Sequence, residues 1–356
     1  MHKYLLSTLL LTFSGFTFSQ ITDPDSSSVQ KIDEVQVSSF YGEIVFEKAD
    51  HLVIDFLINS DQSLLIIKNR KDYKLSMYDK DFTFVHSISI DFKPKNLFED
   101  CFGNFYIFSE ENMHPIEIVN DSVHILAPEP LDAYLKYYRN CYGSLGNQMI
   151  MIKNTDFGVT QEYFSFDLAH QQERYFYQIS DTARKEDAER LFYEIEVKRG
   201  RSVERMKEIN IAQLKRVRGA FDDVQFYDQV QSKPMYNPLF IDSNRIMIFN
   251  HFNSVATIFN TNLEEIASIP IDYHQSINWN KQVLFDQERK KLYSMNLENG
   301  VSSLIYLKNE DLKEVNSIPL SEASYPEKVM VSDGFAYYLI FPNMDRTFSR
   351  LYRQKL

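Results

Sequence analysis

The sequence predicts an all-β protein made of six repeated units, each with four short strands. A largely apolar tetrapeptide recurs, beginning at residues 64, 105, 149, 246, 292 and 336. Apolar and polar residues alternate in the segments around it, and β-branched and aromatic residues are frequent there, as in strands. Four strands in a repeat of about 44 residues are typical of one blade of a β-propeller. The sequence therefore predicts a six-bladed β-propeller.

Each unit is predicted to contain the same four elements in the same order. A first strand ends near an acidic residue, and the apolar tetrapeptide forms the second strand. A polar turn, usually with Asn, leads to the third strand, and a fourth strand closes the unit. In the fourth unit these strands are predicted at 239–242, 246–249, 256–259 and 266–271. A single blade cannot bury both of its faces, so neighbouring blades are expected to pack together around an axis.

An aspartate recurs at the end of the first strand, as Asp100, Asp242, Asp286 and Asp333. A ring of carboxylates on one side of a propeller could bind a cation. Aspartate at a strand end more commonly accepts hydrogen bonds from the backbone of the next turn. We expect this structural role.

The long interval between the third and fourth units predicts an insertion of about 53 residues. From residue 181 to residue 219 the pattern changes to helical spacing, with Asp181 or Thr182 as the first cap and Ser202 as the second. The insertion is therefore predicted to be a helical hairpin between blades 3 and 4. Residues 198–218 contain eight Lys or Arg and two Glu. Such a basic helix is suited to an acidic partner, to lipid headgroups or to the acidic propeller itself.

The last unit is too short for a fourth strand, because the sequence ends at Leu356. Two strand-like stretches near the N-terminus, 32–37 and 43–46, belong to no unit. Either one is expected to supply the missing strand, which would join the two ends of the propeller and cover an open sheet edge.

The N-terminus has the features of a secretory signal peptide. His2 and Lys3 precede an apolar run over 4–18, and small residues follow it. We expect cleavage after Ser19, a flexible leader over 20–30 and the propeller over 31–356. The mature protein is then expected to be secreted or periplasmic and not transmembrane, because no second apolar run of spanning length follows.

The two cysteines lie in similar tetrapeptides, Cys101-Phe102-Gly103-Asn104 and Cys141-Tyr142-Gly143-Ser144. This similarity predicts that they occupy the same position in neighbouring repeats. A disulfide needs Cα atoms within about 7 Å, and equivalent points on adjacent repeats are often farther apart. The sequence favours two unbridged thiols, and a bridge is the alternative.

The stretch Glu99-Asp100-Cys101-Phe102-Gly103-Asn104-Phe105-Tyr106, the six units and the export signal together resemble secreted six-bladed β-propeller proteins of Gram-negative bacteria, which are NHL-like propellers. The resemblance is one of repeat pattern and covers residues 30–356. It implies the fold and export, and it carries no catalytic signature.

Composition and motifs exclude several functions. The net charge of −12 argues against nucleic acid as the main partner, because binding phosphates needs a positive surface. The sequence has no His-Glu-x-x-His, no zinc spacing, no Gly-x-Ser-x-Gly, no phosphate loop and no calcium loop. We therefore expect no cofactor, no metal site and no catalytic residue that a linear motif would reveal.

Topology indicates which side of the propeller to suspect. The fourth-to-first connections lie on the same side as the second-to-third turns, and the insertion is one of these connections. Loops held by a rigid scaffold often carry function. The candidate binding residues are Arg70, His114, His251, Tyr273, His274 and Trp279 in the propeller and Lys198, Arg199, Arg201 and Arg205 in the insertion.

Two functions are compatible with this pattern. The first is an exported, non-catalytic binding module that contacts a protein or glycan of the cell envelope through the insertion-bearing side. The second is a propeller enzyme, a lyase or hydrolase acting on an extracellular glycan or peptide. Its active site would be assembled from several blades and would need no linear motif.

Overall fold

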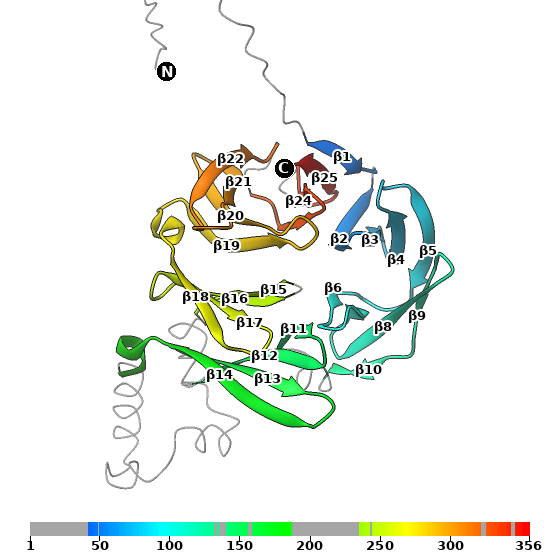
Figure 1. Cartoon of the computed structure of the whole chain (residues 1–356). Coiled ribbons are helices and arrows are strands. Elements are labelled where there is room, and N and C mark those ends of the chain that lie inside the picture. The colour runs from blue at the N-terminus through cyan, green and yellow to red at the C-terminus, as the bar shows by residue number, and fades with distance from the viewer. Residues whose placement is uncertain are drawn as a thin grey trace, which may run out of the picture. The chain divides into compact units, whose positions relative to one another are not determined.

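Six antiparallel sheets follow one another in sequence order around a centre (Figure 1). The computed structural model describes residues 42–48, 50–131, 134, 140–155, 159–186, 235–242, 244–321, 325–342 and 346–356. All of them belong to one unit, Phe40–Leu356. The predicted six-bladed β-propeller is therefore confirmed.

The first three blades are built from strands β2 to β14. Blade 1 contains β2 (His51–Ile58), β3 (Gln62–Asn69), β4 (Asp72–Asp79) and β5 (Phe84–Ile90). Blade 2 contains β6 (Asn96–Glu99), β7 (Phe105–Phe108) and β8 (Asn112–Val119), with β9 (Ser122–Ile125) and β10 (Glu129–Pro130) both paired to the outer edge of β8. Blade 3 contains β11 (Cys141–Leu145), β12 (Gln148–Thr155), β13 (Thr160–Asp167) and β14 (Gln172–Ser180).

The last three blades follow the insertion. Blade 4 contains β15 (Leu239–Asp242), β16 (Arg245–Asn250), β17 (Val255–Asn260) and β18 (Glu265–Pro270). Blade 5 contains β19 (Trp279–Asp286), β20 (Lys291–Glu298), β21 (Val301–Leu307) and β22 (Glu314–Pro319). Blade 6 contains β23 (Lys328–Ser332), β24 (Phe335–Ile340), β25 (Arg350–Lys355) and β1 (Glu43–Phe46).

In the apolar tetrapeptides, apolar residues follow one another without alternating polar residues, because these strands are buried on both faces. In β3, Leu64 and Ile66 pack into the core shared with blade 2, whereas Leu65 and Ile67 pack into the core shared with blade 6. Successive side chains of a strand point to opposite faces, so an uninterrupted apolar run fills two cores at once. Each fully buried side chain of this size contributes about 1.5–3 kcal/mol.

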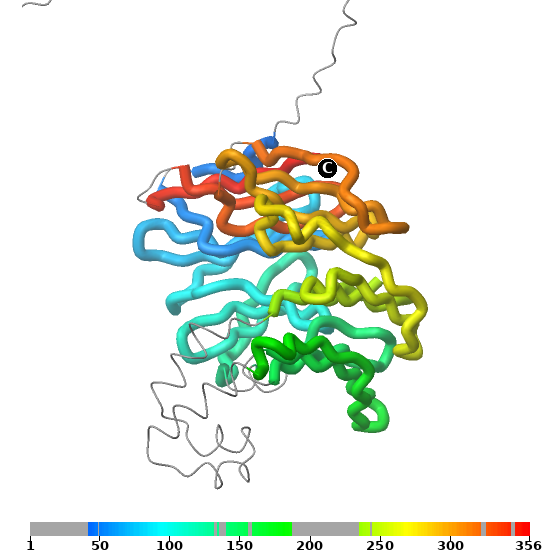
Figure 2. Tube along the Cα trace, turned by 90° about the vertical axis from the view of Figure 1, so that its left-hand side faces the viewer, coloured from blue at the N-terminus to red at the C-terminus, as the bar shows by residue number. Residues whose placement is uncertain are grey.

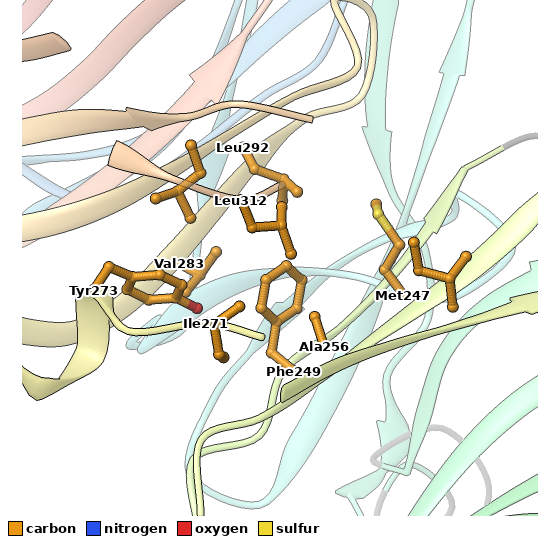
Figure 3. Packing of buried hydrophobic residues seen from close by; sticks show 10 residues of the cluster. Met247, Phe249, Ala256, Ile271, Tyr273, Val283, Leu292 and Leu312 are labelled. Atoms are coloured by element: carbon orange, nitrogen blue, oxygen red, sulfur yellow. The ribbon is translucent and has the colours of Figure 1, made fainter. Parts of the chain in front are cut away.

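The core between blades 4 and 5 is likewise formed by alternate side chains of a second strand that face the neighbouring blade (Figure 3). Met247 and Phe249 of β16 face blade 5, where they belong to one cluster with Val283 of β19 and Leu292 of β20. Tyr273, from the connection between the two blades, is part of the same cluster. The connection is therefore anchored in the core that it crosses.

The N-terminal strand closes the ring. Glu43, Ile44 and Phe46 of β1 pair with Arg353, Tyr352 and Leu351 of β25. Figures 1 and 2 both show the blue β1 beside the red end of the chain. The predicted completion of the last blade by 43–46 is confirmed, and the other candidate stretch, 32–37, lies outside the described residues.

The expectation of two unbridged thiols is wrong, because Cys101 and Cys141 form a disulfide with a Cα–Cα distance of 5.8 Å. The two residues do not occupy equivalent positions. Cys141 pairs with Met151, the third residue of its tetrapeptide, and in blade 2 the residue paired with the third position, Ile107, is Leu97. Leu97 is thus the position in blade 2 that corresponds to Cys141, and Cys101 lies four residues after it. With this offset the two sulfur atoms are close enough to form a bond.

The predicted N-cap of the insertion is present. The Asp181 carboxylate accepts a hydrogen bond from the backbone N–H of Arg184 (3.0 Å), and residues 182–186 are helical. Residues 187–234 lie outside the described residues, so the helical hairpin over 181–219 stays a prediction. The same holds for the signal peptide (1–19) and the leader (20–30). Within the described ranges, no helix is long and apolar enough to span a membrane.

Candidate functional site

Four of the predicted binding residues come together on the insertion-bearing side of blades 4 and 5. His251 lies in the turn between β16 and β17. Tyr273 and His274 lie in a short 3-10 helix, η2 (Tyr273–Gln275), which connects blade 4 to blade 5, and Trp279 is the first residue of β19. We call these four residues and Tyr236 the His251 cluster.

Both ring nitrogens of His251 have protein partners. Nδ1 lies 2.7 Å from the backbone carbonyl oxygen of Tyr236, and Nε2 lies 2.7 Å from the hydroxyl oxygen of Tyr273. A carbonyl oxygen only accepts hydrogen bonds, so these partners assign the proton to Nδ1. Nε2 then accepts a hydrogen bond from Tyr273, which is the arrangement of a neutral imidazole.

Aromatic packing holds this imidazole away from solvent. The His251 ring stacks on Tyr236 with a centroid distance of 5.5 Å, and it lies 4.7 Å from the Trp279 ring. Burial lowers the pKa of His251 to about 4 and raises the pKa of Tyr273 above its ordinary value. At neutral pH the cluster therefore contains an uncharged histidine and an uncharged tyrosine.

Further hydrogen bonds tie the cluster to both blades. The Tyr236 hydroxyl accepts a hydrogen bond from the backbone N–H of Val283 in β19 (2.7 Å). The Nε2 atom of His274 lies 3.2 Å from Oγ of Ser254 in the β16–β17 turn, and burial lowers the pKa of His274. In the described part of the chain, the buried Nε1 of Trp279 has no hydrogen-bond partner. The cluster thus fixes the β16–β17 turn against the connection that carries η2.

Two exposed apolar residues flank the His251 cluster. Phe252 follows His251 and is 48% exposed, and Ile277 lies between η2 and Trp279 and is 99% exposed. Among the large apolar residues that the structure describes, Ile277 is the most exposed. We call these two residues the apolar pair.

The remaining candidates lie elsewhere. Arg70 is in the β3–β4 turn of blade 1, exposed, with an Asp50 oxygen 4.0 Å away. His114 is buried in β8 of blade 2 and stacks on Phe92 at a centroid distance of 3.6 Å. No contact among the described residues joins either of them to the His251 cluster. Lys198, Arg199, Arg201 and Arg205 lie outside the described residues.

The sequence did not reveal a cavity of about 570 Å³ on the opposite side of the ring. Its walls come from the first strands and the following turns of blades 2, 3, 4 and 5. Each blade contributes a few residues, so no linear motif marks the cavity. The only local signals were the glycine-containing turns that follow Asp100 and Cys141.

The recurring aspartates lie on this same side. Asp100 and Asp286 have the expected structural role, whereas Asp242 forms ion pairs with Arg245 and Lys290 and Asp333 forms one with Arg289. Asp100 accepts backbone hydrogen bonds from Phe102 (2.8 Å) and Asn104 (2.9 Å) in its own turn. Asp286 accepts one from Gly334 of the next blade (2.6 Å). The described part of the chain contains no group of three or more His, Cys, Asp or Glu residues that could hold a metal ion.

Comparison with known proteins finds only distant structural similarity. No protein-family model matches the chain, and no curated protein matches it. Among solved structures, an inactive form of virginiamycin B lyase from Staphylococcus aureus with quinupristin has a TM-score of 0.36 at 9% identity, over 88% of this chain and 98% of that chain. A luciferin-regenerating enzyme has a TM-score of 0.36 at 9% identity, over 82% and 87%.

TolB from Acinetobacter baumannii has a TM-score of 0.37 at 9% identity, over 83% of this chain and 65% of that chain. Similarity at this level carries no argument about substrate or partner. The chain is a six-bladed β-propeller, and its function has to be inferred from its own residues.

Proposed function

We propose that this protein is an exported binding module that docks a protein partner through the insertion-bearing side of blades 4 and 5. The observation that carries the proposal is the apolar pair, Phe252 and Ile277, presented by two loops that the His251 cluster holds together. Rigid presentation lowers the entropy lost on binding, and exposed apolar side chains on a rigid support are typical anchors of protein interfaces.

The hydrogen bonds of the histidines favour binding over catalysis. A general base needs a ring nitrogen within reach of the substrate. Both nitrogens of His251 are occupied by protein groups, and Nε2 of His274 faces Ser254. The cluster is therefore better suited to support a surface than to exchange protons with a substrate.

The chemistry of the apolar pair favours a protein partner over a glycan partner. Sugars are bound by planar aromatic faces together with polar groups, whereas Ile277 offers only an aliphatic surface. Lys198, Arg199, Arg201 and Arg205 of the insertion belong to the proposal as contacts for acidic groups on the same partner.

The test compares three variants with the wild-type protein in capture from a cell-envelope extract, followed by binding measurements with the purified partner. The double variant Phe252→Ser/Ile277→Ser is expected to weaken binding at least tenfold, and deletion of 181–219 to weaken it further. Ile266→Ser is the control, because Ile266 is an exposed apolar residue (58%) on β18 of blade 4 that lies outside the apolar pair.

Equal binding by the double variant and the control would refute the role of the apolar pair. A glycan captured in place of a protein would refute the proposed partner. Turnover in a screen of polysaccharides and peptides that disappears in His251→Ala or His274→Ala would establish the enzyme alternative instead.

A further inference from the structure

The cavity on the side opposite the apolar pair has two chemically different walls. Blades 3, 4 and 5 supply the aromatic side chains of Tyr142, Phe240 and Phe285, and the rings of Phe240 and Phe285 lie 5.6 Å apart. The same blades also supply the polar side chains of Ser144, Asp242 and Gln287. Blade 2 supplies the carboxyl groups of Glu99 and Asp100. A volume of about 570 Å³ is within the range of small-molecule sites, which is roughly 300–1,000 Å³.

Most charges at this cavity are already neutralised by protein groups. The two carboxylate oxygens of Asp100 accept hydrogen bonds from its own turn, from the Asn104 side chain and from the Tyr106 hydroxyl. Asp242 lies 2.8 Å from Nζ of Lys290 and 3.4 Å from Nε of Arg245. These two aspartates need no ligand.

Glu99 differs from both aspartates. No hydrogen bond or ion pair joins its carboxylate to another residue in the described part of the chain. Glu99 is an exposed residue of the cavity wall, where partial desolvation raises its pKa and the negative charges of Asp100 and of Glu288, from blade 5, raise it further. A carboxylate that is flanked by like charges and has no ion-pair partner is stabilised when a cation binds beside it.

We propose that this cavity binds an organic cation that carries an ammonium group on an apolar, preferably aromatic, body. The ammonium pairs with Glu99, and the apolar body lies against Phe240, Phe285 and Tyr142. Aromatic faces also attract ammonium groups directly. An anionic ligand would be repelled by Glu99 and Glu288, and a neutral one would gain no charge attraction from Glu99.

This chemistry is shared by free amines and by the N-terminus of a short peptide. Phenethylamine and tryptamine represent the first source, and phenylalanyl-glycinamide represents the second. Phenethyl alcohol has the same aromatic body without the charge. Isothermal titration calorimetry on the full chain measures these four probes and methylamine, which has the charge without the aromatic body. The source is identified by whichever binds more tightly, the free aromatic amines or the peptide.

Glu99→Gln removes the charge at nearly constant size and is expected to weaken amine binding at least tenfold. Glu117→Gln is the matched control, because Glu117 is an exposed carboxylate on β8 of the same blade that does not line the cavity. Tyr142→Ala, at a half-exposed residue of the cavity rim, is expected to weaken the aromatic amines but not methylamine.

Three results would overturn the proposal. One is the absence of saturable binding for every amine up to about 10 mM, a Kd that corresponds to a marginal interaction. The second is an amine affinity that Glu99→Gln leaves unchanged. The third is equal affinity for phenethylamine and phenethyl alcohol. None of them bears on the apolar pair on the other side of the ring.

Discussion

Nζ of Lys328 in blade 6 lies 2.8 Å from Oδ1 of Asp55 in blade 1, and Oδ2 of the same carboxylate accepts a hydrogen bond from the backbone N–H of Leu97 in blade 2. One largely buried carboxylate thus connects three consecutive blades. Lys328 also donates to the carbonyl oxygen of Phe56 (2.6 Å). The inner strands of these blades are therefore linked by polar contacts as well as by apolar packing.

Lys328→Met is expected to lower the free energy of unfolding by about 1–3 kcal/mol, because it leaves part of a buried carboxylate without its partner. Chemical denaturation measures the change. Lys308→Met removes an exposed ion pair with Glu310 and should change stability by less than about 0.5 kcal/mol. Equal effects of the two substitutions would contradict a role for Asp55 in joining the blades.

The disulfide between Cys101 and Cys141 is expected to stabilise the fold by about 3–4 kcal/mol, since it closes a loop with a sequence separation of 40 residues. The oxidised wild-type protein should show no reactive thiol after denaturation, and its melting temperature should fall when a reductant is added. In the Cys101→Ser/Cys141→Ser variant the melting temperature should be low and insensitive to reductant. A wild-type melting temperature that ignores reductant would count against this bridge.

Gly42 is expected to be intolerant of substitution. A Cβ atom at this position would lie 2.5 Å from the hydroxyl oxygen of Tyr338, which itself bonds to Gln354. Gly42→Ala should therefore displace β1 and cost about 1–3 kcal/mol. Hydrogen exchange should become faster at 43–46 and in β25. Val315→Ala, on the exposed face of β22, serves as the control, and unchanged exchange in Gly42→Ala would mean that β1 does not depend on this close approach.

The stability of the protein is expected to fall in acid through His251. Its folded-state pKa of about 4 lies below the unfolded value of about 6.5, so protons bind preferentially to the unfolded chain. The contribution is fully present above pH 6.5 and is lost as the pH falls toward 4. Between pH 7 and pH 5 it amounts to about 2 kcal/mol. Unfolding of His251→Gln at the two pH values should show a pH dependence smaller by this amount; an identical pH dependence would contradict a neutral, buried imidazole.

The repeat pattern was sufficient to predict the fold because every blade is packed on both sides. The apolar tetrapeptides 64–67 and 246–249 fill two cores each, which leaves a strong and regular signal in the sequence. The closing strand was predictable for a related reason, since the last unit lacked a strand and 43–46 was unassigned. Strand pairing was harder. The four-residue offset between Cys101 and Cys141 depends on registers that similar tetrapeptides do not reveal.

The candidate site was predictable only in part. His251, Tyr273, His274 and Trp279 could be placed on one side from topology, but the partners of each ring nitrogen depend on backbone positions such as the carbonyl of Tyr236. The cavity was missed because Glu99, Leu239 and Phe285 come from three blades and meet only when the ring closes. Sequence periodicity describes single blades, whereas a central cavity is a property of the whole ring.

The seam of the ring has a dynamic consequence. β1 contributes three residue pairs to blade 6, interrupted by a bulge, whereas β24 and β25 form six. Brief separation of β1 from β25 is therefore expected to be the local opening of blade 6 that requires the least free energy. None of the described residues of blade 6 lines the cavity, so separation of β1 from β25 leaves the described cavity walls in place. A molecule held at the centre should slow amide exchange throughout the blades that open only by global unfolding, while exchange at the seam continues at its own rate.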